Sequence, residues 1–281
     1  MGQKLLTVAV TGANGYVGSC VADYLRKHNF LVYEMGRSFK SRQYFIPFSL
    51  EKEISPKSFK NIDVLIHCAW DFKQIMWKDI IRINVNGSLR LFKAAKKDGV
   101  KKIIFISTMS AFEGCKSLYG KAKLEVERKA REFNALVVRP GLVYNNRSAG
   151  MVGALEKLIT ISPLVPIVAG NQVLYLCHSE DLSKLVTRSC TSNIKITKPI
   201  IAASEKGLRF REILRILAER KGKKRIFIPI PSWIVLFLLK IVEKVGIKTR
   251  LKSDSLISLL NADPRPDFTE TRKTKVRFRE F

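Results

Sequence analysis

The sequence predicts an α/β protein in which a doubly wound parallel sheet carries a smaller, mainly helical C-terminal lobe. Short apolar runs alternate with helical patterns up to about residue 140, a glycine-rich turn follows the first run, and this rhythm changes after Pro140. Strands that alternate with helices imply βαβ units with parallel strands. With 281 residues and 46% hydrophobic residues, the chain is long enough for a nucleotide-binding core and an added lobe.

The runs that we expect to form strands are short and rich in branched residues, as is typical of strands buried on both faces. They lie at 5–10, 31–35, 62–69, 101–108 and 134–140. Helical patterns occupy 79–99 and 117–133, and a strand, a helix and a strand at 173–204 are expected to return to the sheet edge.

The first strand run leads into TGANGYVG, where Gly12, Gly15 and Gly18 are three residues apart at the start of a helical pattern. Glycines here permit a tight turn, a close approach of the backbone to a pyrophosphate and close packing of helix on strand. The alternative is an ordinary glycine-rich β–α turn, which the flanking strand and helix disfavour. The expected cofactor contacts in this loop are Gly12, Asn14, Gly15, Tyr16, Val17 and Gly18.

The second strand run decides the expected cofactor. An NAD site usually has an acidic residue near the end of this strand, for the ribose 2′-hydroxyl. Here Arg37 and Ser38 stand at that place, Lys40 and Arg42 follow, and strand alternation puts Glu34 on the opposite face. A guanidinium matches the geometry of a 2′-phosphate. We therefore expect NADP, unless Arg37 is one more surface cation of a basic protein.

Tyr119 and Lys123 are four residues apart in a helical pattern, in the run LYGKAK, and therefore share one helix face. An ammonium beside a phenol is expected to lower the pKa of the tyrosine, so that it can exchange a proton while hydride moves to or from a nicotinamide. A tyrosine and a lysine at this spacing occur by chance on many helices, so the pair gains its weight from its place after the fourth strand.

These motifs together resemble the short-chain dehydrogenase/reductase superfamily, in particular its extended branch of nucleotide-sugar epimerases and dehydratases. Besides the glycine loop and LYGKAK, the runs that carry the resemblance are IDVLIHCAW (62–70), INVNGSLRLFKAA (83–95), VVRPGLVYNN (137–146) and CHSEDLSKLV (177–186). They cover residues 5–190 in the order of the family. The resemblance implies a Rossmann-type core at 1–145 plus 173–204 and a substrate lobe at 146–172 plus 205–281.

The resemblance also assigns roles around the catalytic pair. A hydroxyl at the end of the fourth strand would bind the reacting carbonyl or hydroxyl, which points to Thr108, with Ser107 and Ser110 as alternatives. A dehydratase typically has an Asp-Glu pair just after this threonine, and Met109 and Ser110 stand there instead. The catalytic set that we expect is therefore Thr108, Tyr119 and Lys123.

Further cofactor contacts follow from the matched runs. Ala69 and Trp70 would lie beside the cofactor, with Trp70 replacing a small alanine of the family. Asn84 would hold the active-site region together, and Val143 would lie in the segment that passes the nicotinamide. The histidines have no metal-ligand partners in the sequence, and we expect no metal site.

The charge is strongly basic: 51 Lys and Arg residues minus 24 Asp and Glu residues give a net charge of +27. Such a balance favours anionic partners. The cations are spread along the chain, as on a solvated surface, and no nucleic-acid module is visible, so we expect no nucleic acid. The apolar run PSWIVLFLLKIVEKVG (231–246) is interpreted either as a helix packed in the substrate lobe or as one lying on an anionic membrane.

The leading hypothesis is an NADP-dependent oxidoreductase that reduces a keto group of a nucleotide-linked or lipid-linked sugar. The alternatives are a nucleotide-sugar epimerase of the same family and a non-catalytic NADP-binding regulator or subunit. The substrate is expected to be a small anionic molecule, and the family resemblance suggests a homodimer. Five widely spaced cysteines are typical of reduced thiols, which indicates a cytoplasmic protein.

Overall fold

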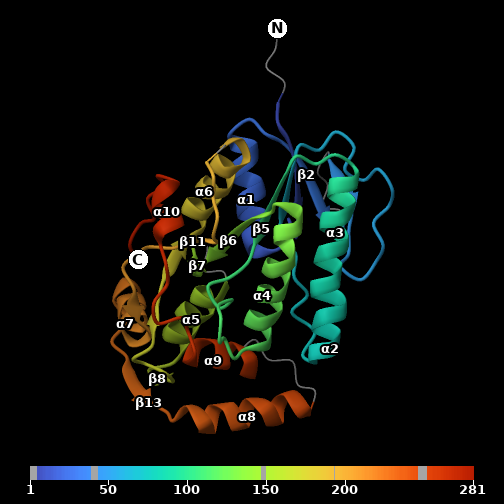
Figure 1. The fold of residues 1–281 in the computed structure, drawn as a ribbon. Helices are drawn as coiled ribbons and strands as arrows, with labels where there is room; N and C mark the ends of the chain where they lie inside the picture. The colour runs from blue at the N-terminus through green and yellow to red at the C-terminus, as the bar shows by residue number, and fades with distance from the viewer. Residues whose placement is uncertain (1–4, 39–43, 147–149, 193, 246–251) are drawn as a thin grey trace.

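The core of the protein is a seven-stranded parallel sheet (Figure 1). The structure is a computed structural model that describes residues 5–38, 44–146, 150–192, 194–245 and 252–281. The strand order is β3-β2-β1-β4-β5-β6-β11, and every pairing in it is parallel. This confirms the predicted doubly wound sheet.

The five expected strand runs all form strands of this sheet, and 196–204 supplies its last one. The strands are β1 (Thr7–Thr11), β2 (Leu31–Gly36), β3 (Phe45–Pro47), β4 (Val64–His67), β5 (Lys102–Ile106), β6 (Leu136–Pro140) and β11 (Ile200–Ala202). The sequence analysis missed β3, because three residues that end in proline have no readable alternation. Its partner β2 supplies the hydrogen bonds that make it a strand.

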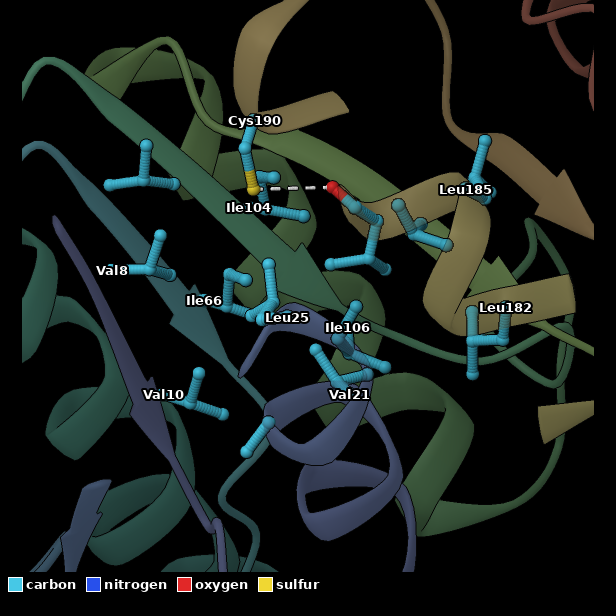
Figure 2. Close-up of a cluster of buried hydrophobic side chains, with 14 of the residues drawn as sticks. Val8, Val10, Val21, Leu25, Ile66, Ile104, Ile106, Leu182, Leu185 and Cys190 are labelled. Carbon is cyan, nitrogen blue, oxygen red and sulfur yellow. Dashed lines mark hydrogen bonds between the residues drawn. The ribbon is translucent and has the colours of Figure 1, made fainter. Parts of the chain in front are cut away.

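Helices cover both faces of the sheet. The helices α1 (Tyr16–Lys27) and α6 (Ser179–Thr191) pack on one face, and α3 (Asn86–Lys97) and α4 (Leu118–Ala130) pack on the other. Figure 2 shows the first of these two cores, where Val8 and Val10 of β1 lie near Val21 of α1. Because side chains alternate along a strand, Ala9 between them belongs to the opposite core.

The helix expected at 79–99 is interrupted. The chain forms a short α2 (Trp77–Asp79), then a π-helical segment η1 (Ile80–Val85), then α3. Such π segments often occur at functional sites. Here the segment carries Asn84, whose side chain holds Asp71: the Asp71 backbone N–H donates to Asn84 Oδ1 at 2.7 Å, and Asn84 Nδ2 donates to the Asp71 carbonyl at 3.1 Å. Asn84 thus anchors the loop that follows β4.

The remaining elements form a second, smaller core against the carboxyl ends of the strands. The helices are α5 (Gly150–Ile161), α7 (Phe210–Arg220), α8 (Ser232–Lys244) and α9 (Ser253–Leu260). The short strands are β7 (Leu142–Tyr144), β8 (Leu164–Ile167), β9 (Val173–Leu174), β10 (Leu176–His178), β12 (Leu208–Arg209) and β13 (Ile226–Pro229). Apolar side chains of α5, α7 and β8 meet in this core. The lobe is therefore mainly helical, as predicted.

The C-terminal residues return to the sheet. The helix α10 (Thr269–Lys273) lies beside β11, and Val276 joins the core under α1 and α6. Arg279 makes a bidentate ion pair with the buried carboxylate of Asp181, with its shortest contact at 2.6 Å. Asp181 is thus a structural residue that holds the end of the chain. The exact division into two domains stays a prediction.

Candidate active site

The glycine loop between β1 and α1 has the geometry of a phosphate cradle. Gly12 has φ +67°, and a Cβ on it would lie 2.8 Å from the Ala69 nitrogen. A Cβ on Gly18 would lie 2.2 Å from the Gly12 carbonyl oxygen. Gly15 is the N-cap of α1 and has no side chain that could accept hydrogen bonds from the first turn. The backbone N–H groups of that turn are therefore available to bind an anion. The loop therefore fits a dinucleotide pyrophosphate.

Two of the expected loop contacts have structural partners. Asn14 Nδ2 donates to the carbonyl of Ser38 at 3.0 Å, which joins the loop to the end of β2. The ring of Tyr16 packs against Gly150, where a Cβ would lie 2.9 Å from it. Its hydroxyl is buried without a hydrogen-bond partner among the described residues, and burial raises its pKa.

The end of β2 presents a cation. Arg37 and Ser38 are exposed there, beside Asn14. Glu34 is buried and pairs with Arg26 of α1, as its place on the opposite face of the strand suggested. The further cations expected at Lys40 and Arg42 lie outside the described residues.

A series of hydrogen bonds between buried polar side chains supports the glycine loop. Thr11 Oγ1 lies 2.7 Å from His67 Nδ1, and His67 Nε2 lies 2.8 Å from Ser88 Oγ. The Thr11 hydroxyl also accepts from the backbone N–H groups of Cys68 and Ala69, both at 3.2 Å. Burial lowers the pKa of His67 well below its ordinary value, and the nearby lysine adds to this effect. His67 is therefore a neutral structural residue. The hydrogen bonds of Thr11 hold Ala69 against the glycine loop.

Tyr119 and Thr108 meet because α4 approaches the end of β5 very closely. A Cβ on Gly120 would lie 2.2 Å from the Ser110 carbonyl oxygen, so only glycine fits after the tyrosine. Tyr119 and Thr108 line the same cavity. Burial raises the pKa of Tyr119 to about 12, and the nearby Thr108 hydroxyl opposes the rise.

The other two hydroxyls at this strand end are used elsewhere. Ser107 is buried and donates to Glu127 Oε1 at 2.5 Å, in a network with Arg139. Ser110 Oγ accepts from Ser258 Oγ of α9 at 2.7 Å. Of the three hydroxyls, Thr108 is the one that affects the pKa of Tyr119.

Lys123 lies deeper than the sequence suggested. Its side chain is 2% exposed, and Nζ donates to the Ile106 carbonyl at 2.8 Å. Nζ also lies 4.3 Å from the ring centroid of Trp70 and 4.6 Å from that of Phe105. Burial lowers the pKa of Lys123 to about 7. The expectation that Lys123 lowers the pKa of Tyr119 is therefore wrong: burial raises this pKa, and the Lys123 ammonium donates to a backbone carbonyl instead.

Trp70 lies between the two members of the catalytic pair. Its ring meets the Tyr119 ring edge to face, with centroids 5.6 Å apart, while Lys123 lies over it. Trp70 also forms part of the cavity wall beside Tyr119. Val143 lies in β7, opposite Cys177 of β10, and packs against the core under α1 and α6.

An interaction that the sequence analysis missed caps the helix of Tyr119. Asp254 of α9 accepts from the backbone N–H groups of Leu118 and Tyr119, at 2.7 and 3.0 Å. Ser117, the local N-cap, accepts from Gly120 at 3.1 Å. A carboxylate at a helix N-terminus satisfies free N–H groups and complements the helix dipole. Because Asp254 is 135 residues away from Tyr119, no local sequence signal could reveal this contact.

A cavity of about 590 Å³ opens beside Thr108 and Tyr119. Most of its wall is apolar, with contributions from the loop after β4, from α5 and from α9. Its apolar lining includes Trp70, Phe72, Ile75, Met109, Leu118, Met151, Val173 and Ile257. Three lysines, Lys116, Lys240 and Lys252, also line it. Four carboxylates, Asp71, Glu243, Asp254 and Asp263, line it as well. The cavity therefore combines a mostly apolar wall with charged groups of both signs.

The parallel sheet, the glycine loop after β1, Thr108 after β5 and the Tyr119–Lys123 pair on α4 are the features of a dinucleotide-binding protein of the extended short-chain dehydrogenase/reductase class. The model of the NAD dependent epimerase/dehydratase family matches residues 8–199. The chain therefore belongs to this family, whose members are enzymes of the epimerase and reductase kind.

Known proteins that resemble the chain share its fold at low identity. The UDP-glucose 4-epimerase of Vibrio cholerae is 23% identical, over 87% of this chain and 85% of that protein. The structure of the Thermotoga maritima UDP-glucose 4-epimerase with UDP-glucose has a TM-score of 0.71 at 21% identity, and covers 96% of this chain and 99% of that one. The Thermus thermophilus UDP-glucose 4-epimerase in complex with NAD has a TM-score of 0.65 at 19% identity, covering 91% and 97%.

The buried Lys123 predicts a pH-dependent stability. Its pKa is about 7 in the folded protein and about 10.4 in an unfolded chain. The unfolded chain therefore binds more protons between these values, and the free energy of unfolding rises with pH in that window. Urea denaturation should show the parent gaining stability relative to Lys123→Met from pH 7 to about pH 10. The exposed Lys121→Met is the matched control, and a pH-independent difference for Lys123→Met would contradict the assignment.

The contact of Asp254 with α4 predicts a specific loss of stability. Asp254→Asn removes the charge and one of two acceptors at the helix N-terminus, which should lower the free energy of unfolding by about 1 kcal/mol. Asp263→Asn changes another carboxylate of the cavity wall that does not cap this helix, and serves as the control. Equal stability of the two variants in urea denaturation would show that the cap contributes nothing.

Proposed function

We propose that the protein is an NADP-dependent reductase that acts on a keto group of a sugar carried by a phosphate-containing group, either a nucleotide or a lipid. The observation that carries this proposal is that Thr108 and Tyr119 lie together on the wall of the cavity. A carbonyl oxygen placed against both hydroxyls would sit beside the loop that fits a dinucleotide.

The protonation state of Tyr119 suits a proton donor in a reduction. With a pKa of about 12, Tyr119 is a neutral phenol at pH 7 and can donate a proton. A bound nicotinamide supplies the hydride. As the carbonyl carbon gains the hydride, Tyr119 donates its proton to the carbonyl oxygen, and the phenolate regains a proton from solvent. Thr108 positions the oxygen, and Lys123 holds the end of β5 through the Ile106 carbonyl and packs under Trp70.

The end of β2 supports NADP as the cofactor. Arg37 and Ser38 stand beside the glycine loop, where a 2′-phosphate would lie, and Glu34 is engaged with Arg26 on the other side of the strand. A guanidinium forms strong paired hydrogen bonds with phosphate. Solved relatives of this fold are in complex with NAD, so the preference for NADP is a property that we propose for this chain.

The walls of the cavity support the class of substrate. Lys116 lines it and can meet a phosphate, and the ammonium of Lys252 donates to the Phe72 carbonyl at its edge. Two carboxylates of the wall are already engaged, Glu243 by Ser253 and Asp254 by the N-terminus of α4. Relatives named as UDP-glucose 4-epimerases favour a second candidate, an epimerase of a nucleotide sugar. The homodimer suggested by the resemblance stays a prediction.

The reductase, the epimerase and the non-catalytic alternative differ in whether they consume NADPH. A reductase oxidises one NADPH for each keto sugar reduced, which is followed by absorbance with a panel of nucleotide-linked 4-keto sugars. Interconversion of UDP-sugars without net loss of NADPH would establish the epimerase instead. Tight binding of NADPH without turnover on any member of the panel would establish the non-catalytic alternative.

Tyr119→Phe tests the proton donor. The variant keeps the ring that packs on Trp70 and loses the hydroxyl, so turnover should fall by roughly 10²- to 10⁴-fold while the affinity for NADPH is retained. Thr108→Val should act in the same direction with a smaller loss, because it removes an orienting group. NADPH oxidation by Tyr119→Phe at the parent rate would exclude the mechanism.

Arg37→Gln tests the choice of cofactor. Loss of the charge-assisted hydrogen bonds to a 2′-phosphate should weaken NADPH binding by about tenfold to a hundredfold and leave NADH binding unchanged. Lys27→Gln removes an exposed cation at the far end of α1 and is the matched control. Titration calorimetry measures both affinities, and an equal loss for NADPH and NADH would refute the role of Arg37.

A further inference from the structure

The helix α8 exposes a continuous apolar stripe. Its outward residues are Trp233, Phe237, Leu238 and Ile241, and the stripe continues to Val245, which caps the helix; their exposed fractions are 69%, 62%, 54%, 44% and 69%. Four of these follow each other at intervals of four residues, so they lie along one side of the helix. No residue of α8 is buried. Large apolar side chains exposed in a row mark an interaction site.

The apolar surface continues beyond α8. The strand β13, which leads into the helix, exposes Ile226 and Ile228, and its partner β8 exposes Leu164. Figure 1 shows α8 lying across one end of the molecule, with β8 and β13 at one end of the helix. We call α8 with these two strands the α8 face. It forms one outer surface of the lobe.

Positive charge surrounds this apolar surface. Residues 221–245 hold six cations, Lys221, Lys223, Lys224, Arg225, Lys240 and Lys244, and one acid, Glu243. Glu243 accepts from the backbone N–H and the hydroxyl of Ser253, both at 2.7 Å, so its charge is engaged with α9. Lys240 and Lys244 are exposed on the helix itself. An apolar face with lysines at its border matches the interfacial zone of an anionic bilayer.

The dimensions allow the helix to lie on a bilayer. Its 13 residues span about 20 Å, less than the ~30 Å of a hydrocarbon core. Within the described residues, every helix is too short or too polar to cross a membrane. A symmetric pairing of two α8 faces would bring two sets of six cations together, which opposes self-association through this surface.

We propose that the α8 face docks on the surface of an anionic lipid bilayer. Trp233 and Phe237 enter the interfacial zone, while Lys240 and Lys244 meet lipid phosphates. Lys240 and Glu243 also line the cavity, so docking places the cavity wall at the bilayer surface. The proposal concerns the surface of the protein and holds whether or not the proposed reduction is correct.

The test is co-sedimentation of the full chain with vesicles of phosphatidylcholine alone and of phosphatidylcholine with phosphatidylglycerol. We expect binding to the anionic vesicles, weakened when salt is raised from about 0.1 M to about 1 M. Trp233→Ser combined with Phe237→Ser should reduce binding about tenfold or more. Lys240→Glu combined with Lys244→Glu should do the same through charge, and it keeps the test decisive if the first variant fails to fold.

The control is Lys93→Glu combined with Lys97→Glu, which reverses two exposed lysines at the same spacing on α3. Binding equal to the parent is expected for this variant. Absence of binding to anionic vesicles, or an equal loss in the α3 and α8 charge variants, would overturn the proposal. A dimer in sedimentation velocity that the α8 variants dissociate would also overturn it, because the face would then bind a second copy.

Discussion

The parallel pairing of β1 with its neighbours is the constraint on which the rest of the structure depends. Because β2, β1, β4, β5 and β6 run in one direction, their carboxyl ends meet at one edge of the sheet. The glycine loop, the Arg37 turn, the Trp70 loop and Thr108 each follow one of these strands. Residues separated by up to a hundred positions in sequence are thereby brought to a common site.

At this edge of the sheet, backbone segments contact each other directly, with no side chain between them. Gly12 touches Ala69, Gly18 touches Gly12, and Gly120 touches Ser110, each at a distance that no Cβ would tolerate. The first two contacts form the phosphate cradle and the third brings Tyr119 to Thr108. The interval from Thr108 to Tyr119 is only 11 residues, and the turn over it closes because α4 can lie directly on the backbone of Ser110.

The lobe affects the chemistry through few contacts. Asp254 caps the helix of Tyr119 and Ser258 bonds to Ser110, so α9 is connected to both the tyrosine helix and the turn after Thr108. The same lobe carries α8 outward, where its apolar stripe lacks a protein partner among the described residues. One side of the lobe therefore organises the site while the other faces the surroundings with positive charge.

The sequence by itself predicted the sheet apart from β3, the glycine loop and the place of Tyr119 and Lys123 on one helix, because strand runs, glycine spacing and the Tyr119–Lys123 spacing depend on local periodicity. It also placed Glu34 correctly, since alternation along a strand decides which face a side chain takes. The pKa values of Tyr119 and Lys123 depend on the tertiary structure alone. Burial raises the pKa of Tyr119 and lowers that of Lys123, and burial depends on Trp70 and on the packing of distant elements. The Asp254 cap and the exposed stripe of α8 were decided in the same way, because each depends on which surfaces the folded chain brings together or leaves uncovered.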